Sequence, residues 1–313
     1  MSNTALLIPI PKKAKYGTSS FLWSAIENIL LPAGYGRPIL LAALNLADDF
    51  QGLTGKRIRF ACGEAVGLAI RFEISAKING EESYSLLGDG KGIVVKASTE
   101  KGLFYGIQTL RQMLRQGEIK YQQFDIQDSP DYQVRGFYHD VTRGAIPTME
   151  TLFQLVDKMA FYKMNHLELY IEHTFALAKH PDIWEGADPL TAEEILRLQD
   201  YCTERNIELV PSIATFGHCY MAMRSKRLKD LNEMDADISE WPFSFRDRMQ
   251  HATLNPSDPR SIKLVADILG EFLPLFKSKY GNICGDETFD LGRGKNKHLV
   301  KSEEDIQKIY MSS

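Results

Sequence analysis

The stretch "VRGFYHDVTRGAIPTMETLFQLVDKMAFYKMNHLELYIE" (residues 134–172) has the pattern of a strand, a helix and a second strand. Residues 134–141 and 166–172 are short runs rich in aromatic and aliphatic residues, which favour strands. Between them, apolar residues recur at helical spacing over 149–163. A strand–helix–strand unit of this kind predicts two parallel strands in one sheet.

The same alternation continues along the chain. A helix is expected over 191–206, a strand over 207–213, a helix over 258–280 and a fourth strand in "NICGD" (282–286). Repeated units of this kind predict an α/β fold with a parallel sheet, in which functional residues lie at the carboxyl ends of the strands. A complete barrel needs about 250 residues, more than residues 134–313 provide. We therefore expect either an open sheet or a barrel of which about the first four βα units are present.

The first part of the chain has a different character, because its first 138 residues contain no histidine. It mixes expected strands and helices in the manner of a small α+β domain. The strands are expected at 56–62, 68–75 and 92–98, and the helices at 37–50 and 98–116. A polar linker is expected at 125–132. We predict a small α+β domain over 1–128 and the first half of a barrel, apparently truncated, over 129–313.

Composition excludes several classes of protein. The chain is 44% hydrophobic and 25% charged, with a net charge of -4, as expected for a soluble globular protein without nucleic acid or membrane partners. No run approaches the roughly 18 apolar residues of a membrane span. The start has neither the order nor the length of a secretory signal, and the four cysteines are scattered. These features predict a cytoplasmic location.

Ionisable residues gather at or just after the expected strand ends. They are His139, Asp140 and Arg143 after the first strand, Glu172 and His173 after the second, His218 after the third, and Asp286 and Glu287 after the fourth. Parallel strands bring their carboxyl ends to one edge of a sheet, so we expect these side chains to converge there. Their convergence is a stronger signal than any one of them.

Glycoside hydrolysis is the first chemistry that suits this set. It needs a proton donor at the leaving oxygen and charge stabilisation at the anomeric carbon. Asp286 and Glu287 leave a strand end together, so neither easily reaches the opposite face of a sugar ring. Attack by the substrate's own acetamido group would remove the need for a protein nucleophile. One carboxylate would then orient the amide, and the other would act as acid and later as base.

Metal-assisted hydrolysis is the alternative chemistry. Its ligands would be His139, His173, His218 and Asp286. The sequence contains no His-x-His pair and no His-Glu-x-x-His helix, which weighs against this hypothesis. A third interpretation is a non-catalytic module that binds glycans without turning them over.

The ordered series "RGFYHDVTR", "KMNHLELYIEH", "PSIATFGH" and "ICGDE" resembles glycoside hydrolase family 20, the β-N-acetylhexosaminidases. "STEKGLFYGIQTLRQML" (98–114) also resembles the end of the small domain that precedes the barrel in that family. The resemblance implies a (β/α)8 barrel and the removal of terminal β-linked GlcNAc or GalNAc with retention. The substrate acetamido group would be the nucleophile, with an oxazolinium intermediate. No metal or organic cofactor is implied, and the partner is a glycan or glycoside that ends in an N-acetylhexosamine.

The resemblance also implies roles for individual residues. Glu287 would be the general acid/base, and Asp286 would hold the acetamido nitrogen. Arg143 would bind sugar hydroxyls, usually O3 and O4, and His218 would belong to a polar network beside the acid.

Two features depart from the family pattern. His173, in "IEHTF", stands where the first aspartate of a pair is usual in the family, so the network around the acid is expected to differ in charge. The tryptophans of the pocket wall and the tyrosine that binds the acetamido oxygen are expected beyond residue 313. We therefore expect a fragment, an assembly in which self-association completes the barrel, or an inactive remnant.

Overall fold

The structure is a computed structural model that describes residues 5–63, 66–242, 244, 246 and 252–311. The chain divides into two compact units. One takes in the chain up to Arg135 together with Gln154–Asn165 and Tyr201–Ile207, and the other takes in the remainder. Two pieces of the later sequence thus belong to the first unit, and the domain boundary after residue 128 stays a prediction.

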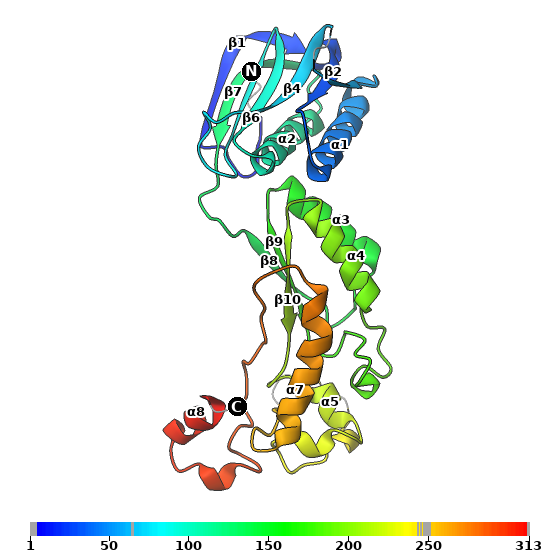
Figure 1. Cartoon of the computed structure of the whole chain (residues 1–313), viewed down its shortest axis with the longest axis vertical. Coiled ribbons are helices and arrows are strands. Elements are labelled where there is room, and N and C mark those ends of the chain that lie inside the picture. The colour runs from blue at the N-terminus through cyan, green and yellow to red at the C-terminus, as the bar shows by residue number, and fades with distance from the viewer. Residues whose placement is uncertain (1–4, 64–65, 243, 245, 247–251, 312–313) are drawn as a thin grey trace. The chain divides into compact units, whose positions relative to one another are not determined.

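The first unit is a mixed sheet of seven strands with two helices. In spatial order the strands are β1 (Lys13–Leu22), β7 (Lys120–Asp128), β5 (Tyr84–Asp89), β6 (Gly92–Ala97), β4 (Leu68–Ile74), β2 (Ile26–Leu31) and β3 (Arg59–Cys62). Helix α2 (Glu100–Arg115) packs against β4, β5 and β6, and α1 (Arg37–Thr54) packs beside α2 (Figure 1). The expected strands and helices of this region all appear.

Helix α2 shows why the local prediction succeeded. The Thr99 side chain accepts a hydrogen bond from the Gly102 backbone N–H, which caps the helix start. The predicted apolar positions are buried, with Leu103, Ile107 and Leu110 fully inaccessible. Capping and periodicity are both local signals, so the sequence carries them without knowledge of the fold.

The linker predicted at 125–132 is wrong over 125–128, because these residues complete β7. In β7 the buried Phe124 and Ile126 alternate with more polar residues, and the strand pairs on both sides, with β1 and β5. A strand buried on only one face can be this polar, so composition alone suggested a linker.

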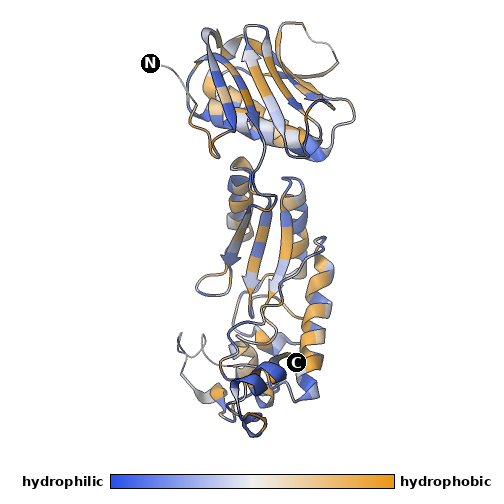
Figure 2. Cartoon of the chain, turned by 90° about the vertical axis from the view of Figure 1, so that its left-hand side faces the viewer, coloured by the Kyte–Doolittle hydropathy of each residue, from blue (hydrophilic) through white to orange (hydrophobic). Residues whose placement is uncertain are grey.

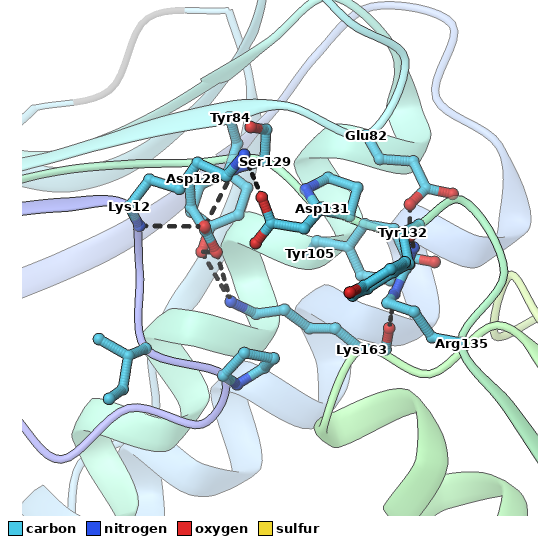
Figure 3. A pocket seen from close by; sticks show the side chains of 13 residues that line it. Lys12, Glu82, Tyr84, Tyr105, Asp128, Ser129, Asp131, Tyr132, Arg135 and Lys163 are labelled. Atoms are coloured by element: carbon cyan, nitrogen blue, oxygen red, sulfur yellow. Dashed lines mark hydrogen bonds and ion pairs between the residues drawn. The ribbon is translucent and has the colours of Figure 1, made fainter.

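A buried ion-pair network lies within the first unit, around a pocket of about 160 Å³ (Figure 3). Lys163, from the "KMN" stretch, donates to the Tyr84 hydroxyl at 2.7 Å and to Asp128 Oδ2 at 3.1 Å. Its side chain is 7% exposed and that of Asp128 is 11% exposed. Arg135 pairs with Glu82 at 2.7 Å on the same pocket. The charges at this pocket are matched by opposite charges, as expected for a structural network.

The second unit contains a parallel sheet of three strands in chain order: β8 (Gly136–Asp140), β9 (His166–Ile171) and β10 (Glu208–Ile213). The connecting helices are α3 (Met149–Phe161) and α4 (Ala192–Thr203), whose later residues belong to the first unit, and α7 (Pro259–Phe272) follows β10. Figure 2 shows this sheet face-on. The register places Asp140 beside Tyr170 and Tyr170 beside Ser212. The strands therefore end at one edge, as a barrel-type α/β fold requires.

The fourth strand, expected at 282–286, is wrong as a strand. The segment runs parallel to β10 but touches it through a single bridge, Ser212 to Asn282. Two backbone hydrogen bonds hold it there, from Ile213 N to Asn282 O at 3.0 Å and from Asn282 N to Pro211 O at 2.8 Å. Cys284 then adopts a φ of 46°, which ends extended pairing.

The helix expected over 258–280 begins as predicted, with Asp258 as cap and Pro259 in the first turn, but α7 ends at Phe272. Pro274 follows within a short 3-10 turn, Leu273–Leu275, and proline cannot continue an α-helix. Helix α8 (Glu303–Met311) was not predicted. Among the described residues, no helix is long and apolar enough to cross a membrane.

Candidate active site

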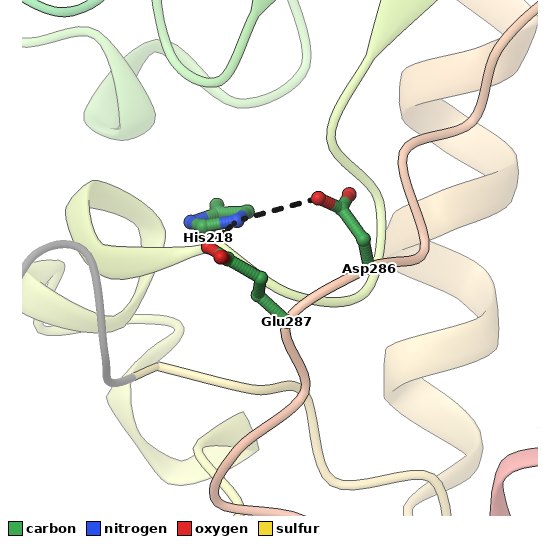
Figure 4. Close-up of side chains that lie close together, drawn as sticks. All are labelled: His218, Asp286 and Glu287. Atoms are coloured by element: carbon green, nitrogen blue, oxygen red, sulfur yellow. Dashed lines mark ion pairs between the residues drawn. The ribbon is translucent and has the colours of Figure 1, made fainter.

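Three ionisable side chains meet beyond the end of β10: His218, Asp286 and Glu287 (Figure 4). His218 Nε2 lies 3.1 Å from Glu287 Oε2 and 4.0 Å from Asp286 Oδ2. The His218 side chain is only 2% exposed, whereas those of Asp286 and Glu287 are 66% and 41% exposed. A fixed, buried imidazole thus faces two carboxylates that are open to solvent.

The contact between His218 and Glu287 is close without being a hydrogen bond. His218 Nε2 is buried and has no hydrogen-bond partner among the described residues. At 3.1 Å the distance is suitable, so the angle is what falls short. Catalytic hydrogen bonds are often poorly aligned before substrate binds, so this close contact is compatible with a role for His218 beside Glu287.

The backbone at this site is under unusual constraint. His218 has a φ of 55°, Glu287 a φ of 53° and Cys284 a φ of 46°. Non-glycine residues seldom adopt such values, and those that do cluster at functional sites. Gly217 lies so close to the other segment that a Cβ there would be 2.3 Å from the Asp286 carbonyl oxygen. Direct backbone contact therefore sets how closely the segment of His218 approaches the segment of the two carboxylates.

A second cluster surrounds Arg143, just after β8. Its Nε donates to Glu172 Oε1 at 3.1 Å, its Nη2 donates to the Tyr170 hydroxyl at 3.1 Å, and its Nη1 lies 3.5 Å from Asp140 Oδ2. Burial opposes the charge of Arg143, but the neighbouring Tyr170, Glu172 and Asp140 together raise its pKa. The Glu172 side chain is 2% exposed and that of Arg143 is 25% exposed. Glu172 is thus an internal anchor, and Arg143 is the member that can reach a ligand.

Tyr170 connects the two clusters. Its hydroxyl donates to Glu172 Oε1 at 3.1 Å, and its ring meets the His218 ring edge-on with centroids 6.3 Å apart. It is buried with Ala214 and Cys284 beneath the site. Burial, followed by the charge of Glu172, raises the pKa of Tyr170 well above its usual range. Tyr170 therefore stays a neutral hydrogen-bond donor between the two groups of charges.

The metal ligands proposed from the sequence do not form one group. Adjacent strand residues point to opposite faces, so His139 points away from the face of Asp140, and its ring stacks on Phe137 instead. Among the described residues, the group of three metal-binding side chains whose donor atoms all lie within 4.8 Å of one another is His218, Asp286 and Glu287. The ligand set of His139, His173, His218 and Asp286 is therefore wrong, and His173 follows β9 next to Glu172 without joining the three.

Sequence reasoning missed the residues that support the site. Buried Glu233 accepts hydrogen bonds from the backbone N–H groups of Gly292 and Asn296, at 3.1 and 3.0 Å. Asp290 Oδ2 accepts one from Ala252 N at 2.8 Å. These bonds tie the loop after β10 to the segment after Glu287. Their partners lie between 38 and 63 residues apart in sequence, so no local pattern reveals them.

Comparison with known proteins places the chain in a family. Residues 4–129 match the model described as glycosyl hydrolase family 20, domain 2. Residues 132–312 match the model of the glycosyl hydrolase family 20 catalytic domain, which alone covers more than half of the chain. The chain belongs to glycoside hydrolase family 20.

Individual relatives agree with this assignment. The chain is 24% identical to a β-hexosaminidase of Porphyromonas gingivalis, over 90% of this chain and 38% of that protein. It is 25% identical to a lacto-N-biosidase of Bifidobacterium bifidum, over 78% of this chain and 21% of that protein. The chain therefore spans well under half the length of these two relatives.

Solved structures share the fold. A chitobiase of Flavobacterium johnsoniae superposes with a TM-score of 0.79 at 22% identity, covering 98% of this chain and 50% of that one. A mutant β-hexosaminidase of Streptomyces plicatus, in complex with its product GlcNAc, superposes with a TM-score of 0.78 at 24% identity, covering 97% of this chain and 64% of that one.

Proposed function

We propose that this chain carries the acid/base half of a retaining exo-β-N-acetylhexosaminidase, which removes terminal β-linked GlcNAc or GalNAc with the substrate's acetamido group as nucleophile. The observation that carries the proposal is the arrangement of Glu287 and Asp286 side by side, with buried His218 3.1 Å from the Glu287 carboxylate. Family membership supplies the reaction class and the expected division of roles, and the close approach of His218 to Glu287 supports Glu287 as the acid.

In the proposed reaction, Glu287 protonates the glycosidic oxygen while the acetamido oxygen attacks the anomeric carbon. The bond to the leaving alcohol breaks, and an oxazolinium forms. Asp286 orients the acetamido group and stabilises the positive charge that develops on its nitrogen. Glu287, now ionised, then takes a proton from water, which opens the ring and restores the anomeric configuration. His218 positions Glu287 throughout.

Sugar recognition is assigned to the cluster around Arg143. Glu172 holds the guanidinium from the buried side, which leaves its exposed edge for sugar hydroxyls. His173 follows Glu172 directly and is proposed to bind the substrate on the same side of the site. Arg143→Lys should raise KM more than it lowers kcat, because lysine keeps the charge but loses the planar fork of donors. A loss in kcat with unchanged KM would contradict a role in binding.

Dependence on the acetamido group is the sharpest test of the mechanism. The natural full-length protein should hydrolyse an aryl β-N-acetylglucosaminide and should leave the matching 2-hydroxy glucoside intact. A thiazoline analogue of the cyclised intermediate should inhibit it. Equal cleavage of the two sugars would exclude attack by the acetamido group.

Glu287→Gln should abolish turnover of substrates with poor leaving groups and preserve binding of GlcNAc. Glu185→Gln serves as the control, because Glu185 is an exposed carboxylate of the same unit in the loop after β9. Full activity in Glu287→Gln would refute the acid assignment. Calorimetric binding of GlcNAc without hydrolysis by the wild-type protein would instead favour a glycan-binding module.

Completion of the barrel by a second chain is also proposed. In the described part of the second unit, Tyr138 on β8 is 50% exposed and neighbouring Phe137 is 40% exposed, which is a large apolar exposure for strand residues. Self-association that covers this strand should appear as a dimer or larger species in light scattering. A monomer at all concentrations would refute it.

The cytoplasmic location stays a prediction, which cell fractionation would check.

A further inference from the structure

We propose that His218, Asp286 and Glu287 bind a divalent transition-metal ion, of which Zn²⁺ is the best fit, and that the bound ion inhibits the enzyme. The three side chains offer one nitrogen and two carboxylate oxygens within 4.8 Å of one another. Binding of the ion depends on this geometry alone. Inhibition also rests on the function proposed above, because it requires Glu287 to be the acid.

The separations between donor atoms suit a small ion. The Nε2 atom of His218 lies 3.1 Å from the Glu287 oxygen and 4.0 Å from the Asp286 oxygen. A tetrahedral Zn²⁺ with bonds of about 2.0–2.2 Å holds its ligand atoms roughly 3.4 Å apart. Both carboxylates are exposed and free to rotate, so a slight adjustment brings all three atoms to that spacing.

The buried nitrogen is an independent sign of a ligand. His218 Nε2 is enclosed, has no hydrogen-bond partner among the described residues, and points toward the two carboxylates (Figure 4). Buried polar atoms in folded proteins nearly always have a partner. A cation between the imidazole and the carboxylates would satisfy the nitrogen and reduce the repulsion between the two acids at once.

The donor set also selects among cations. Mg²⁺ and Ca²⁺ prefer sites made of oxygen alone, whereas imidazole suits Zn²⁺ and its transition-metal neighbours. Three protein ligands leave a fourth position open to water. An ion held in this way would coordinate the Glu287 carboxylate and prevent it from carrying a proton to the glycosidic oxygen.

Binding is tested by calorimetric titration of ZnCl2 into the natural full-length protein after removal of metals by a chelator. We expect one ion per chain. Glu287→Gln and Asp286→Asn should each weaken binding by at least about tenfold, as expected for loss of a ligand. Both side chains are exposed, so these variants should fold, which circular dichroism would check. Absorption of bound Co²⁺ gives a second readout of the same site.

His166→Gln is the matched control. His166 Nε2 lies 2.8 Å from Glu168 Oε1 at the start of β9, so it forms a histidine–carboxylate pair, and in the described chain this pair is not part of a three-donor group. Zn²⁺ affinity in this variant should equal that of the wild type. Absence of saturable binding, or equal affinity in wild type, Glu287→Gln and Asp286→Asn, would overturn the site.

The inhibitory part has its own readout. Zn²⁺ should lower the hydrolysis of an aryl β-N-acetylglucosaminide at the concentrations that saturate the site, and a chelator should restore it. A rise in activity on adding Zn²⁺ would overturn inhibition and favour metal-assisted hydrolysis. Stoichiometric Zn²⁺ binding by a protein without hydrolase activity would uphold the site and refute the proposed function, so the two failures are distinguishable.

Discussion

Gly217→Ala should pull His218 away from the two carboxylates and reduce activity strongly. The backbone of Gly217 does not lie in the left-handed region, so alanine meets no conformational obstacle there. The obstacle is space, because a Cβ would stand 2.3 Å from the Asp286 carbonyl oxygen. That oxygen belongs to the backbone and cannot rotate out of the way.

The size of the effect follows from this distance. Ordinary contact begins at 3.4 Å, so the two segments must separate by about 1 Å. A misplacement of about 1 Å at a catalytic group can cost about 100-fold in rate. Forcing an extra methyl group into a packed contact should also destabilise the fold by about 1–3 kcal/mol. We therefore expect a large fall in kcat with a moderate fall in Tm.

Gly270→Ala is the control for this experiment. Gly270 lies in α7, and among the described residues no atom beyond the neighbouring helix backbone lies within 4 Å of its added Cβ, so alanine there should stabilise the protein by about 0.5–1 kcal/mol and leave kcat unchanged. Both variants are compared by thermal melting and by hydrolysis of an aryl β-N-acetylglucosaminide with the natural full-length protein. Unchanged kcat and Tm in Gly217→Ala would refute the close contact. A lower Tm with unchanged kcat would refute the claim that this contact positions Glu287.

Two further predictions concern the first unit. Lys163→Met leaves the largely enclosed Asp128 carboxylate, whose side chain is 11% exposed, without its cation and should cost about 3–5 kcal/mol in urea unfolding. Lys12→Met removes an exposed pair and should cost less than about 1 kcal/mol, so equal losses would contradict the argument from burial. Burial raises the pKa of Cys202 to about 12, which leaves a thiolate fraction on the order of 10⁻⁴ at pH 8. Iodoacetamide should therefore label exposed Cys62 and spare Cys202 until the pH approaches that value, and equal labelling at pH 8 in peptide mapping would be inconsistent with it.

The elements predicted well are those whose signal is local. Strands β8, β9 and β10 lie within the predicted ranges, and α2 has the expected cap at Thr99. Strand β1 was missed because it is mostly exposed and polar, with Phe21 as its buried residue. The expected strand at 282–286 failed because Cys284 takes a left-handed conformation, at a point where the chain packs on Ser212. Nothing in the sequence "NICGD" shows that Cys284 must adopt this conformation.

Part of the candidate site could also be predicted from the sequence. His218, Asp286 and Glu287 converge because the segment at 282 runs parallel to β10, although through a single bridge, and so leaves the sheet at the same edge. That Glu172 lies inside, as the anchor of Arg143, depends on Tyr170 and on burial, which no spacing encodes. Adjacent residues of a strand point to opposite faces, so His139 and Asp140 were not to be expected on the same face of the sheet.

Asp286 and Glu287 are exposed to solvent, which limits the electrostatic stabilisation that the described chain can give to the proposed reaction. Near Asp286 and Glu287 water screens every charge, so their interactions with each other and with a substrate are weak. Preorganised electrostatics acts strongly only where water is excluded. Beneath the carboxylates, His218 and Tyr170 are buried, and Gly217 lies in close contact with the Asp286 backbone. In the proposed reaction, we expect whatever covers the open side, whether substrate or further polypeptide, to raise the rate by removing water. A variant that loosens that cover should lose kcat even when these residues are untouched.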